Sequence, residues 1–216
     1  MRIGLFGGTF NPIHRGHLNC SLEVKNWFLL DEIYIIPSAI PPHKGMEDMV
    51  SAKDRLEMIE LAVSGYPGYV VCDVELKRSG PSYTIDTVNH MISTASRGLE
   101  LVLILGLDAV LEIHTWKSYM SFFNLLPLIV MNRPGKKRHR EILGEYLRAQ
   151  ISREYKYSAE DKAFVHKDKK PVYLHNGSLM DISSSRIREL IKQSRPVNNL
   201  VPKAVDDYIV KKGLYK

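Results

Sequence analysis

The residues with the clearest chemical potential lie in one segment near the N-terminus, GGTFNPIHRGH at residues 7–17. Gly7 and Gly8 have no Cβ, so their backbone amides can come close to a bound group. Thr9 adds a hydroxyl donor. His14 and His17 are three residues apart, and on a helix that spacing places two side chains on the same side. Because the first amides of a helix attract anions, the segment predicts a cradle for phosphate groups.

Other interpretations of this segment stay open. Two histidines at this spacing could ligate a metal, but no carboxylate or cysteine lies nearby in the sequence to complete a zinc set. A Gly-Gly turn alone is a weak signal, and a single histidine is most often an ordinary surface or core residue. The whole string is more specific, because an apolar run, a glycine turn and an HxGH sequence at a helix start follow in register. The GxGxxG and GxxxxGK[ST] motifs are both absent from the chain.

Two further segments carry groups that suit an anion. Lys44 ends the stiff loop PPHK, and its ammonium is a point charge suited to a phosphate, although an ordinary surface lysine is the simpler interpretation. Near the C-terminus, ISSSRIREL opens a helix for which Ser183 or Ser184 is the expected N-cap. The hydroxyls and free amides at that helix start would form a second anion site.

Two other segments carry groups that could bind an aromatic ring or a ribose. In the segment PSYT, Thr84 is expected to cap a helix N-terminus, with Tyr83 beside it. Trp116 could stack on an aromatic ring, and Asp108 could accept hydrogen bonds from ribose hydroxyls. By propensity alone, Asp108 is a helix N-cap and Trp116 is a core residue.

These groups need elements to position them, and strand and helix signals alternate along the chain. Strands are predicted over residues 2–6, 32–37, 69–76, 99–105, 127–132 and 171–175. Helices are predicted over 17–30, 51–65, 84–96, 108–113, 138–150, 183–193 and 202–212, with another after Trp116, while the polar residues 151–170 have no clear assignment. This alternation predicts an α/β fold, a Rossmann-like doubly wound parallel sheet with helices on both faces. Residues 1–216 are expected to form a single domain, with a small helical C-terminal lobe over about 183–216.

Composition restricts the class of protein. The chain has 216 residues, of which 44% are hydrophobic and 25% charged, as in soluble globular proteins. No apolar run reaches the ~20 residues that span a bilayer, and the N-terminus does not resemble a signal peptide, so no membrane association is expected. Cys20 and Cys72 are too few for a disulfide framework and favour a reducing cytoplasm.

The net charge of +6 suggests an anionic partner. Residues 136–170 hold 11 basic and 6 acidic side chains, so most of the excess positive charge lies in this one segment. A solvated helical face and loop is the preferred interpretation. Because acids interleave with the basic residues and no aromatic stacking platform accompanies them, no nucleic-acid partner is expected. An RNA-binding or regulatory domain is the more distant alternative.

Several segments, taken in order, resemble one enzyme family. The strand–GGTFNPIHRGH–helix sequence is similar to the nucleotidylyltransferases that carry an HxGH phosphate motif. Five further segments resemble those of bacterial nicotinate-nucleotide adenylyltransferase and occur in the same order. They are PPHK (41–44), ELKRSGPSYT (75–84), LGLDAVLEIHTW (105–116), IVMNRPG (129–135) and ISSSRIREL (182–190). The chain departs from the family pattern at Ser185, where threonine is usual, and at Asn11, which is often aspartate.

The resemblance implies transfer of the adenylyl group of ATP to nicotinate mononucleotide, giving nicotinate adenine dinucleotide and pyrophosphate in NAD biosynthesis. It implies Mg²⁺ held mainly by ATP phosphates, with no metal site built from protein ligands. The residues carried over as catalytic are His14, His17, Lys44 and Arg188. Those for ATP and its phosphates are Gly7, Gly8, Thr9, Phe10, Gly106, Ser184 and Ser185, and those for nicotinate mononucleotide are Tyr83, Thr84, Asp108, Trp116 and Arg133.

In the resembling family, the helix start at Thr84 helps to hold the carboxylate of the pyridine ring, and Trp116 meets that ring. The nearer alternative is a related adenylyltransferase that uses nicotinamide mononucleotide or a phosphopantetheine. The sequence leaves the oligomeric state open, and a homo-oligomer is compatible with it.

Overall fold

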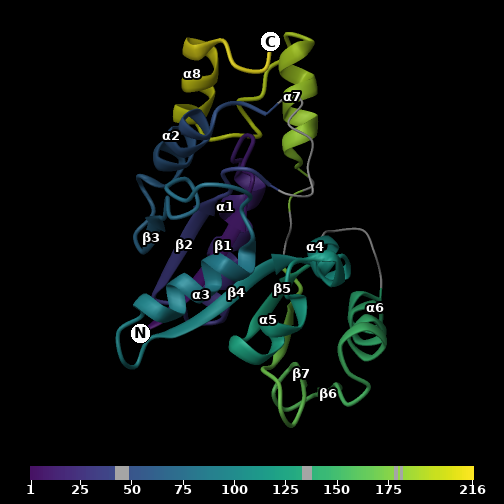
Figure 1. Cartoon of the computed structure of the whole chain (residues 1–216). Coiled ribbons are helices and arrows are strands. Elements are labelled where there is room, and N and C mark those ends of the chain that lie inside the picture. The colour runs from purple at the N-terminus through teal and green to yellow at the C-terminus, as the bar shows by residue number, and fades with distance from the viewer. Residues whose placement is uncertain (42–48, 133–137, 178–179, 181) are drawn as a thin grey trace.

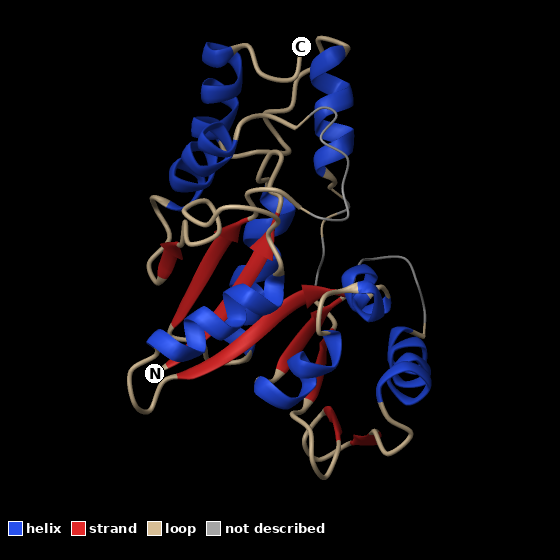
Figure 2. Ribbon diagram, in the orientation of Figure 1, coloured by secondary structure: helices blue, strands red, loops and turns tan. Residues whose placement is uncertain are grey.

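The computed structural model, described for residues 1–41, 49–132, 138–177, 180 and 182–216, is built on one mixed sheet with helices on both faces (Figures 1 and 2). The strand order is β3-β2-β1-β4-β5-β8-β7-β6. The strands are β1 (Arg2–Gly8), β2 (Glu32–Pro37), β3 (Tyr69–Val71), β4 (Glu100–Gly106), β5 (Leu128–Met131), β6 (Lys156–Ser158), β7 (Ala163–Val165) and β8 (Val172–His175).

The chain winds outward from β1 in both directions. β1 pairs in parallel with β2 on one side and with β4 on the other. β3 continues the parallel pairing beyond β2, and β5 and β8 continue it beyond β4. The predicted doubly wound parallel sheet is therefore confirmed for these strands. The order reverses between β1 and β4, which is where such sheets leave a crevice at the carboxyl ends of the strands.

Both faces of the sheet are buried, because the central strands are apolar at successive positions. In β1 and β4, Leu5 and Leu103 belong to one core cluster, while Phe6 and Ile104 belong to the other. The helices that contribute to the first cluster are α3 (Thr84–Thr94), α4 (Leu107–Leu111), α5 (Tyr119–Leu125) and α6 (His139–Tyr146). Those that contribute to the second are α1 (Arg15–Trp27), α2 (Ala52–Val63), α7 (Ser184–Lys192) and α8 (Lys203–Lys212).

The C-terminal helices α7 and α8 lie beyond the carboxyl end of β1, where the glycine turn is, at the top of Figure 1. Ile187 of α7 and Val205 of α8 share their core cluster with Phe6 of β1 and Ile59 of α2. The last helices are therefore packed onto the same core as the first strand. Among the residues that the structure describes, none of the helices combines the length and the apolar character needed to cross a membrane.

Two of the expected helix caps differ from the prediction. Ser183 caps α7 by accepting the amide of Arg186, as predicted, and Ser51 caps α2 by accepting the amide of Asp54. Thr84 is not a cap, because α3 has Tyr83 as its N-cap residue and Thr84 is already helical. Asp108 is likewise inside α4, whose N-cap residue is Gly106.

One predicted strand was too long, and the segment without an assignment contains two strands. The strand expected over 69–76 ends at Val71, because the amides of Leu76 and Lys77 both turn back to the carbonyl of Asp73. The polar segment 151–170, which had no clear assignment, contains the antiparallel hairpin β6–β7, which pairs with β8 and extends the sheet. A short connection can join antiparallel strands without a crossover helix. The helix expected over 138–150 ends its regular part at Tyr146 and continues as a π-helical turn over Leu147–Ile151.

Candidate functional site

Two adjoining cavities lie at the carboxyl ends of β1 and β4, where the strand order reverses. One has a volume of about 300 Å³ and the other about 760 Å³. Both are lined by Gly7 and Gly8 at the end of β1, by Thr9 directly after it and by Gly106 at the end of β4. The glycine turn therefore forms a common wall between two spaces of different size and lining.

His14 and His17 form a reciprocal cap at the start of α1. Nδ1 of His14 accepts the amide of His17, and Nδ1 of His17 accepts the amide of His14, each at 3.3 Å. The rings are stacked, with centroids 3.6 Å apart and planes 20° apart. Because each Nδ1 accepts, the proton of each neutral imidazole resides on Nε2. Both residues line the larger cavity, so the pair brings uncharged N–H donors to it.

Two glycines make this arrangement sterically feasible. A Cβ on Gly16 would lie 3.0 Å from Nδ1 of His14, where it would press on the stacked pair. A Cβ on Gly8 would lie 2.9 Å from the ring of Phe10, which is buried against the turn. The ring of Phe10 in turn meets that of His17 edge-on, with centroids 5.1 Å apart. The absence of a Cβ at Gly16 therefore leaves room for the two imidazoles.

The start of α7 closes the larger cavity from the other side. Ser184 Oγ donates to the carbonyl of Pro12 at 2.9 Å, and Arg188 Nη1 donates to the carbonyl of Asn11 at 2.9 Å. Arg188 also lies 3.4 Å from Ser185 Oγ. These bonds join residues more than 170 positions apart in the sequence and bring the predicted serines and arginine to the cavity that holds the histidine pair.

A buried arginine that sequence reasoning missed holds the glycine turn in place. Arg55 of α2 is 0% exposed, and its guanidinium donates to the carbonyls of Thr9 at 2.8 Å, Ala39 at 3.2 Å and Val50 at 3.4 Å. Desolvation by burial lowers its pKa, and the nearby Tyr215 partly opposes that shift. A signal was present in the sequence, because Arg55 lies four residues before the buried Ile59 and therefore on the apolar face of α2.

Asn11 connects the same turn to two other parts of the chain. Its Oδ1 accepts the amide of Val50 at 3.3 Å and the hydroxyl of Tyr215 at 2.8 Å. The departure from the family's usual aspartate is thus accommodated by an amide oxygen that accepts from neutral donors. Burial raises the pKa of Tyr215, so this hydroxyl stays protonated and able to donate at neutral pH.

The smaller cavity is lined by groups that suit a flat ring with an anionic substituent. Tyr83 and Thr84 line it at the start of α3, and Trp116 lines it from the loop after the 3₁₀ helix Ile113–Thr115. The Trp116 ring is braced edge-on by Phe122, with centroids 6.0 Å apart. Lys117, which sequence reasoning missed, also lines this cavity.

Glu75 is a second residue of this cavity that sequence reasoning missed. It is buried, and it accepts the hydroxyl of Thr87 at 2.6 Å, while Arg78 donates to the same hydroxyl oxygen at 3.2 Å. These bonds fasten the turn after β3 to the first part of α3. The sequence offered little signal for them, because the predicted strand over 69–76 placed Glu75 in a different structure.

Asp108 lies in the first turn of α4, directly after the end of β4. It lines the larger cavity, together with the histidine pair, and it is not among the residues that line the smaller one. Glu112, one turn further along, lines both cavities. Lys44 and Arg133, which were also carried over from the family, lie outside the residues that the structure describes.

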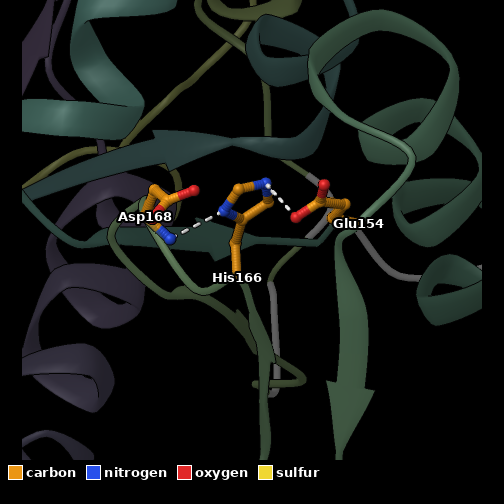
Figure 3. Close-up of side chains that lie close together, drawn as sticks. All are labelled: Glu154, His166 and Asp168. Atoms are coloured by element: carbon orange, nitrogen blue, oxygen red, sulfur yellow. Dashed lines mark hydrogen bonds and ion pairs between the residues drawn. The ribbon is translucent and has the colours of Figure 1, made fainter.

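A separate cluster of Glu154, His166 and Asp168 has the residue types of a metal site (Figure 3). Its hydrogen bonds argue against that role, because Nδ1 of His166 accepts the amide of Asp168 at 3.0 Å and Nε2 faces Ser152 Oγ at 2.9 Å. Neither ring nitrogen therefore has a lone pair directed to a shared ion. None of the three residues lines either cavity. The cluster is an anchor for the β6–β7 hairpin.

Comparisons with known proteins identify the family. Residues 5–190 match the cytidylyltransferase-like family. The chain therefore belongs to this class of proteins.

Curated relatives narrow the class further. A protein of Desulfatibacillum aliphaticivorans named "Probable nicotinate-nucleotide adenylyltransferase" is 39% identical over 219 residues, with 100% of both chains covered. A protein of Geobacter sp. (strain M21) with the same name is 40% identical over 215 residues, covering 100% of this chain and 98% of the relative. At this similarity over its whole length, the chain belongs to the nicotinate-nucleotide adenylyltransferases.

The fold has also been seen in solved structures. Nicotinic acid mononucleotide adenylyltransferase of Plasmodium falciparum, complexed with NaAD, matches with a TM-score of 0.75 at 19% sequence identity. The match covers 99% of this chain and 97% of that one. At this identity the likeness supports the mixed α/β architecture and nothing finer.

Proposed function

We propose that this protein transfers the adenylyl group of ATP to nicotinate mononucleotide, which gives nicotinate adenine dinucleotide and pyrophosphate. The observation that carries the proposal is the pair of cavities that meet at the glycine turn. A dinucleotide-forming enzyme needs two nucleotide pockets whose phosphate ends converge on one point. Gly7, Gly8 and Thr9, which line both spaces, supply that point.

ATP would occupy the larger cavity. Its lining includes the histidine pair, the serine hydroxyls at the start of α7 and the guanidinium of Arg188. Hydrogen-bond donors and one permanent positive charge suit a triphosphate, and a helix N-terminus adds amide donors with a favourable dipole. We assign to ATP and its phosphates the residues Gly7, Gly8, Thr9, Phe10, His14, His17, Gly106, Asp108, Ser184, Ser185 and Arg188.

Nicotinate mononucleotide would occupy the smaller cavity. Its pyridine ring would stack on Trp116, whose ring is already held by Phe122. The ring carboxylate would meet the first amides of α3 at Thr84, next to Tyr83, since a helix N-terminus favours an anion over a neutral amide. Lys44 and Arg133 are proposed for the phosphates and the mononucleotide from the family resemblance alone.

The chemistry requires no general base. The attacking group is the 5′-phosphate of the mononucleotide, which is already ionised at neutral pH. The protein would position one phosphate oxygen in line with the α-phosphorus of ATP and stabilise the charge that moves onto the leaving pyrophosphate. Nε2–H of His14 and His17 and the guanidinium of Arg188 would donate to those oxygens, and no covalent enzyme intermediate would form.

The residues of the larger cavity are compatible with Mg²⁺. This ion keeps several waters and binds through substrate phosphates with one or two carboxylates. Asp108 and Glu112 are the carboxylates in the wall of that cavity, and they would hold the ion through its waters. When bound, the ion would neutralise charge on the ATP phosphates.

We also propose that residues 1–216 act as one domain. The support is that α7 and α8 share a core cluster with β1 and α2, and that both ends of the chain contribute to the larger cavity. The expected C-terminal lobe would then be part of the catalytic unit.

The test is pyrophosphate release from ATP and Mg²⁺ with three acceptors: nicotinate mononucleotide, nicotinamide mononucleotide and phosphopantetheine. We expect a strong preference for nicotinate mononucleotide. Equal turnover of both pyridine mononucleotides would retain the reaction but remove the assignment of the carboxylate to the start of α3. Turnover with phosphopantetheine alone, or with none of the three in a folded sample that binds ATP, would refute the proposed function.

A further inference from the structure

An ion pair that the proposed reaction does not use lies beside the smaller cavity, which is lined by one of its members, Lys117. Nζ of Lys117 is 3.0 Å from both carboxylate oxygens of Asp86. The same ammonium lies 4.8 Å from the centre of the Tyr83 ring. The side chains of Lys117 and Asp86 are 48% and 35% exposed, so the pair is partly open to solvent.

The position of Asp86 determines how this pair affects an anion at the start of α3. Asp86 lies in the first turn of α3, which begins after Tyr83. The amides of that turn are the ones to which we assign the carboxylate of the substrate. An aspartate there stabilises the helix, but its charge repels a second anion at the same place. The ammonium of Lys117 cancels that repulsion.

We propose that Lys117 is a specificity-determining residue that gives the smaller cavity its preference for a pyridine ring with a carboxylate over one with a carboxamide. The inference rests on the proposed function and extends it to a named side chain. Lys117 acts by keeping the start of α3 electrically neutral in the presence of Asp86. Because the two side chains are partly exposed, the effect is moderate and weakens with salt.

The charge of the pair can be set independently at each member. Lys117→Gln leaves the negative charge of Asp86 uncompensated in the first turn of α3, Asp86→Asn leaves a net positive charge, and the double variant is neutral like the native pair. Lys117→Arg keeps the charge and controls for the loss of the native side chain. Lys203→Gln is a matched control, because Lys203 forms a comparable exposed ion pair with Asp207 at 2.7 Å on α8, away from both cavities.

The measurement is the ratio of kcat/KM for nicotinate mononucleotide to kcat/KM for nicotinamide mononucleotide. The two acceptors share the phosphate, the ribose and the pyridinium, so the ratio isolates the carboxylate. We expect Lys117→Gln to lower the ratio by about three- to tenfold and Asp86→Asn to raise it by a similar factor. The double variant, Lys117→Arg and Lys203→Gln are expected to keep the ratio near that of the native protein.

Other outcomes overturn the proposal. If Lys117→Gln slows both acceptors equally, Lys117 has a structural role and does not determine specificity. If the double variant behaves like Lys117→Gln alone, the charge of Asp86 is not what Lys117 neutralises. The proposed function and this inference fail on different results. The proposed function fails if the native protein uses neither mononucleotide. This inference fails if the native protein prefers nicotinate mononucleotide but Lys117→Gln and Asp86→Asn leave that preference unchanged.

Discussion

His14 and His17 act as a unit, because Nδ1 of each histidine accepts the backbone amide of the other. The reciprocal hydrogen bonds and the stacked rings fix both side chains before any ligand binds. Rigid donors directed at developing charge are more effective than mobile ones, since they need no reorganisation during the reaction. We therefore expect the histidines to contribute mainly to turnover and less to stability.

Replacing His17 by alanine tests this expectation. The change removes one of the N–H donors proposed for the phosphates, and it removes the cap on the His14 amide. We expect kcat to fall by about 10²–10³-fold, as for the loss of one donor in other enzymes, while the protein stays folded. Steady-state kinetics and a thermal melt of the same sample measure both effects. His90→Ala, at an exposed position on α3, is the control and should have native kinetics.

At the same scale, the sequence was informative where the chemistry is local. The histidine pair and the serines of α7 are each close together in the sequence and at a helix start, so spacing alone places them. The ion pair of Lys117 and Asp86 joins residues 31 positions apart, and no local pattern relates them. The cap expected at Thr84 was wrong by one residue, which is a common error where helix ends are assigned from propensity.

At the scale of elements, Arg55 joins three segments that must meet for the site to form. Its guanidinium donates to carbonyls in the turn after β1, in the segment after β2 and in the segment before α2. Each carbonyl is left without this donor if the arginine is lost, and an unsatisfied buried acceptor costs about 1–3 kcal/mol. The structure therefore assigns to Arg55 a positioning role for the glycine turn.

Substituting Arg55 by methionine keeps the approximate volume and removes the donors. We expect the free energy of unfolding to fall by about 3 kcal/mol. Tm should then fall by about 6–12 °C. Below that Tm, kcat/KM should still be reduced by about 10- to 100-fold, because the turn that lines both cavities has moved. A variant with native kinetics at low temperature would contradict the positioning role, and Arg97→Met, at an exposed arginine, controls for the loss of charge.

Elements were predictable where apolar periodicity is strong. β1, β2 and β4 were found within a residue or two because their buried faces are continuous runs of apolar residues. The hairpin β6–β7 was missed, since Lys156 and Tyr157 are exposed and only residues such as Tyr155 and Phe164 are buried. In that segment the strands are stabilised by pairing with β8, which local propensity does not predict.

At the scale of the whole molecule, the site exists because a doubly wound sheet leaves a crevice where β1 and β4 diverge. That location was predictable from the order of strands and helices alone. The closure of the crevice by α7 was not, because it depends on contacts between segments far apart in the sequence, such as Ser184 with Pro12. Long-range hydrogen bonds of this kind have no counterpart in local sequence.

Buried titratable groups predict how the stability of the molecule depends on pH. Burial raises the pKa of the Cys20 thiol from its ordinary 9.0 to about 12, and that of the Tyr69 phenol from 10.0 to about 12. When these groups ionise in the unfolded chain, that state binds fewer protons than the folded one. Their contribution to stability is therefore complete below about pH 9 and is lost as the pH rises towards about 12.

Urea unfolding at about pH 8, 9.5 and 10.5 measures this decline. We expect the free energy of unfolding to fall over the series, and to fall less steeply in Tyr69→Phe, which removes one of the two groups. Stability that is unchanged up to about pH 10.5 would contradict the burial of these groups in the folded state.

A crystal structure of the protein bound to its expected product, nicotinate adenine dinucleotide, would test the placement of both nucleotides. We expect the nicotinate ring to stack on Trp116 with its carboxylate at the start of α3. We also expect the adenosine in the larger cavity beside α7 and the pyrophosphate bridge between the glycine turn and the histidine pair. A dinucleotide bound with its pyridine ring outside the smaller cavity, or with its phosphates away from His14 and His17, would contradict this placement.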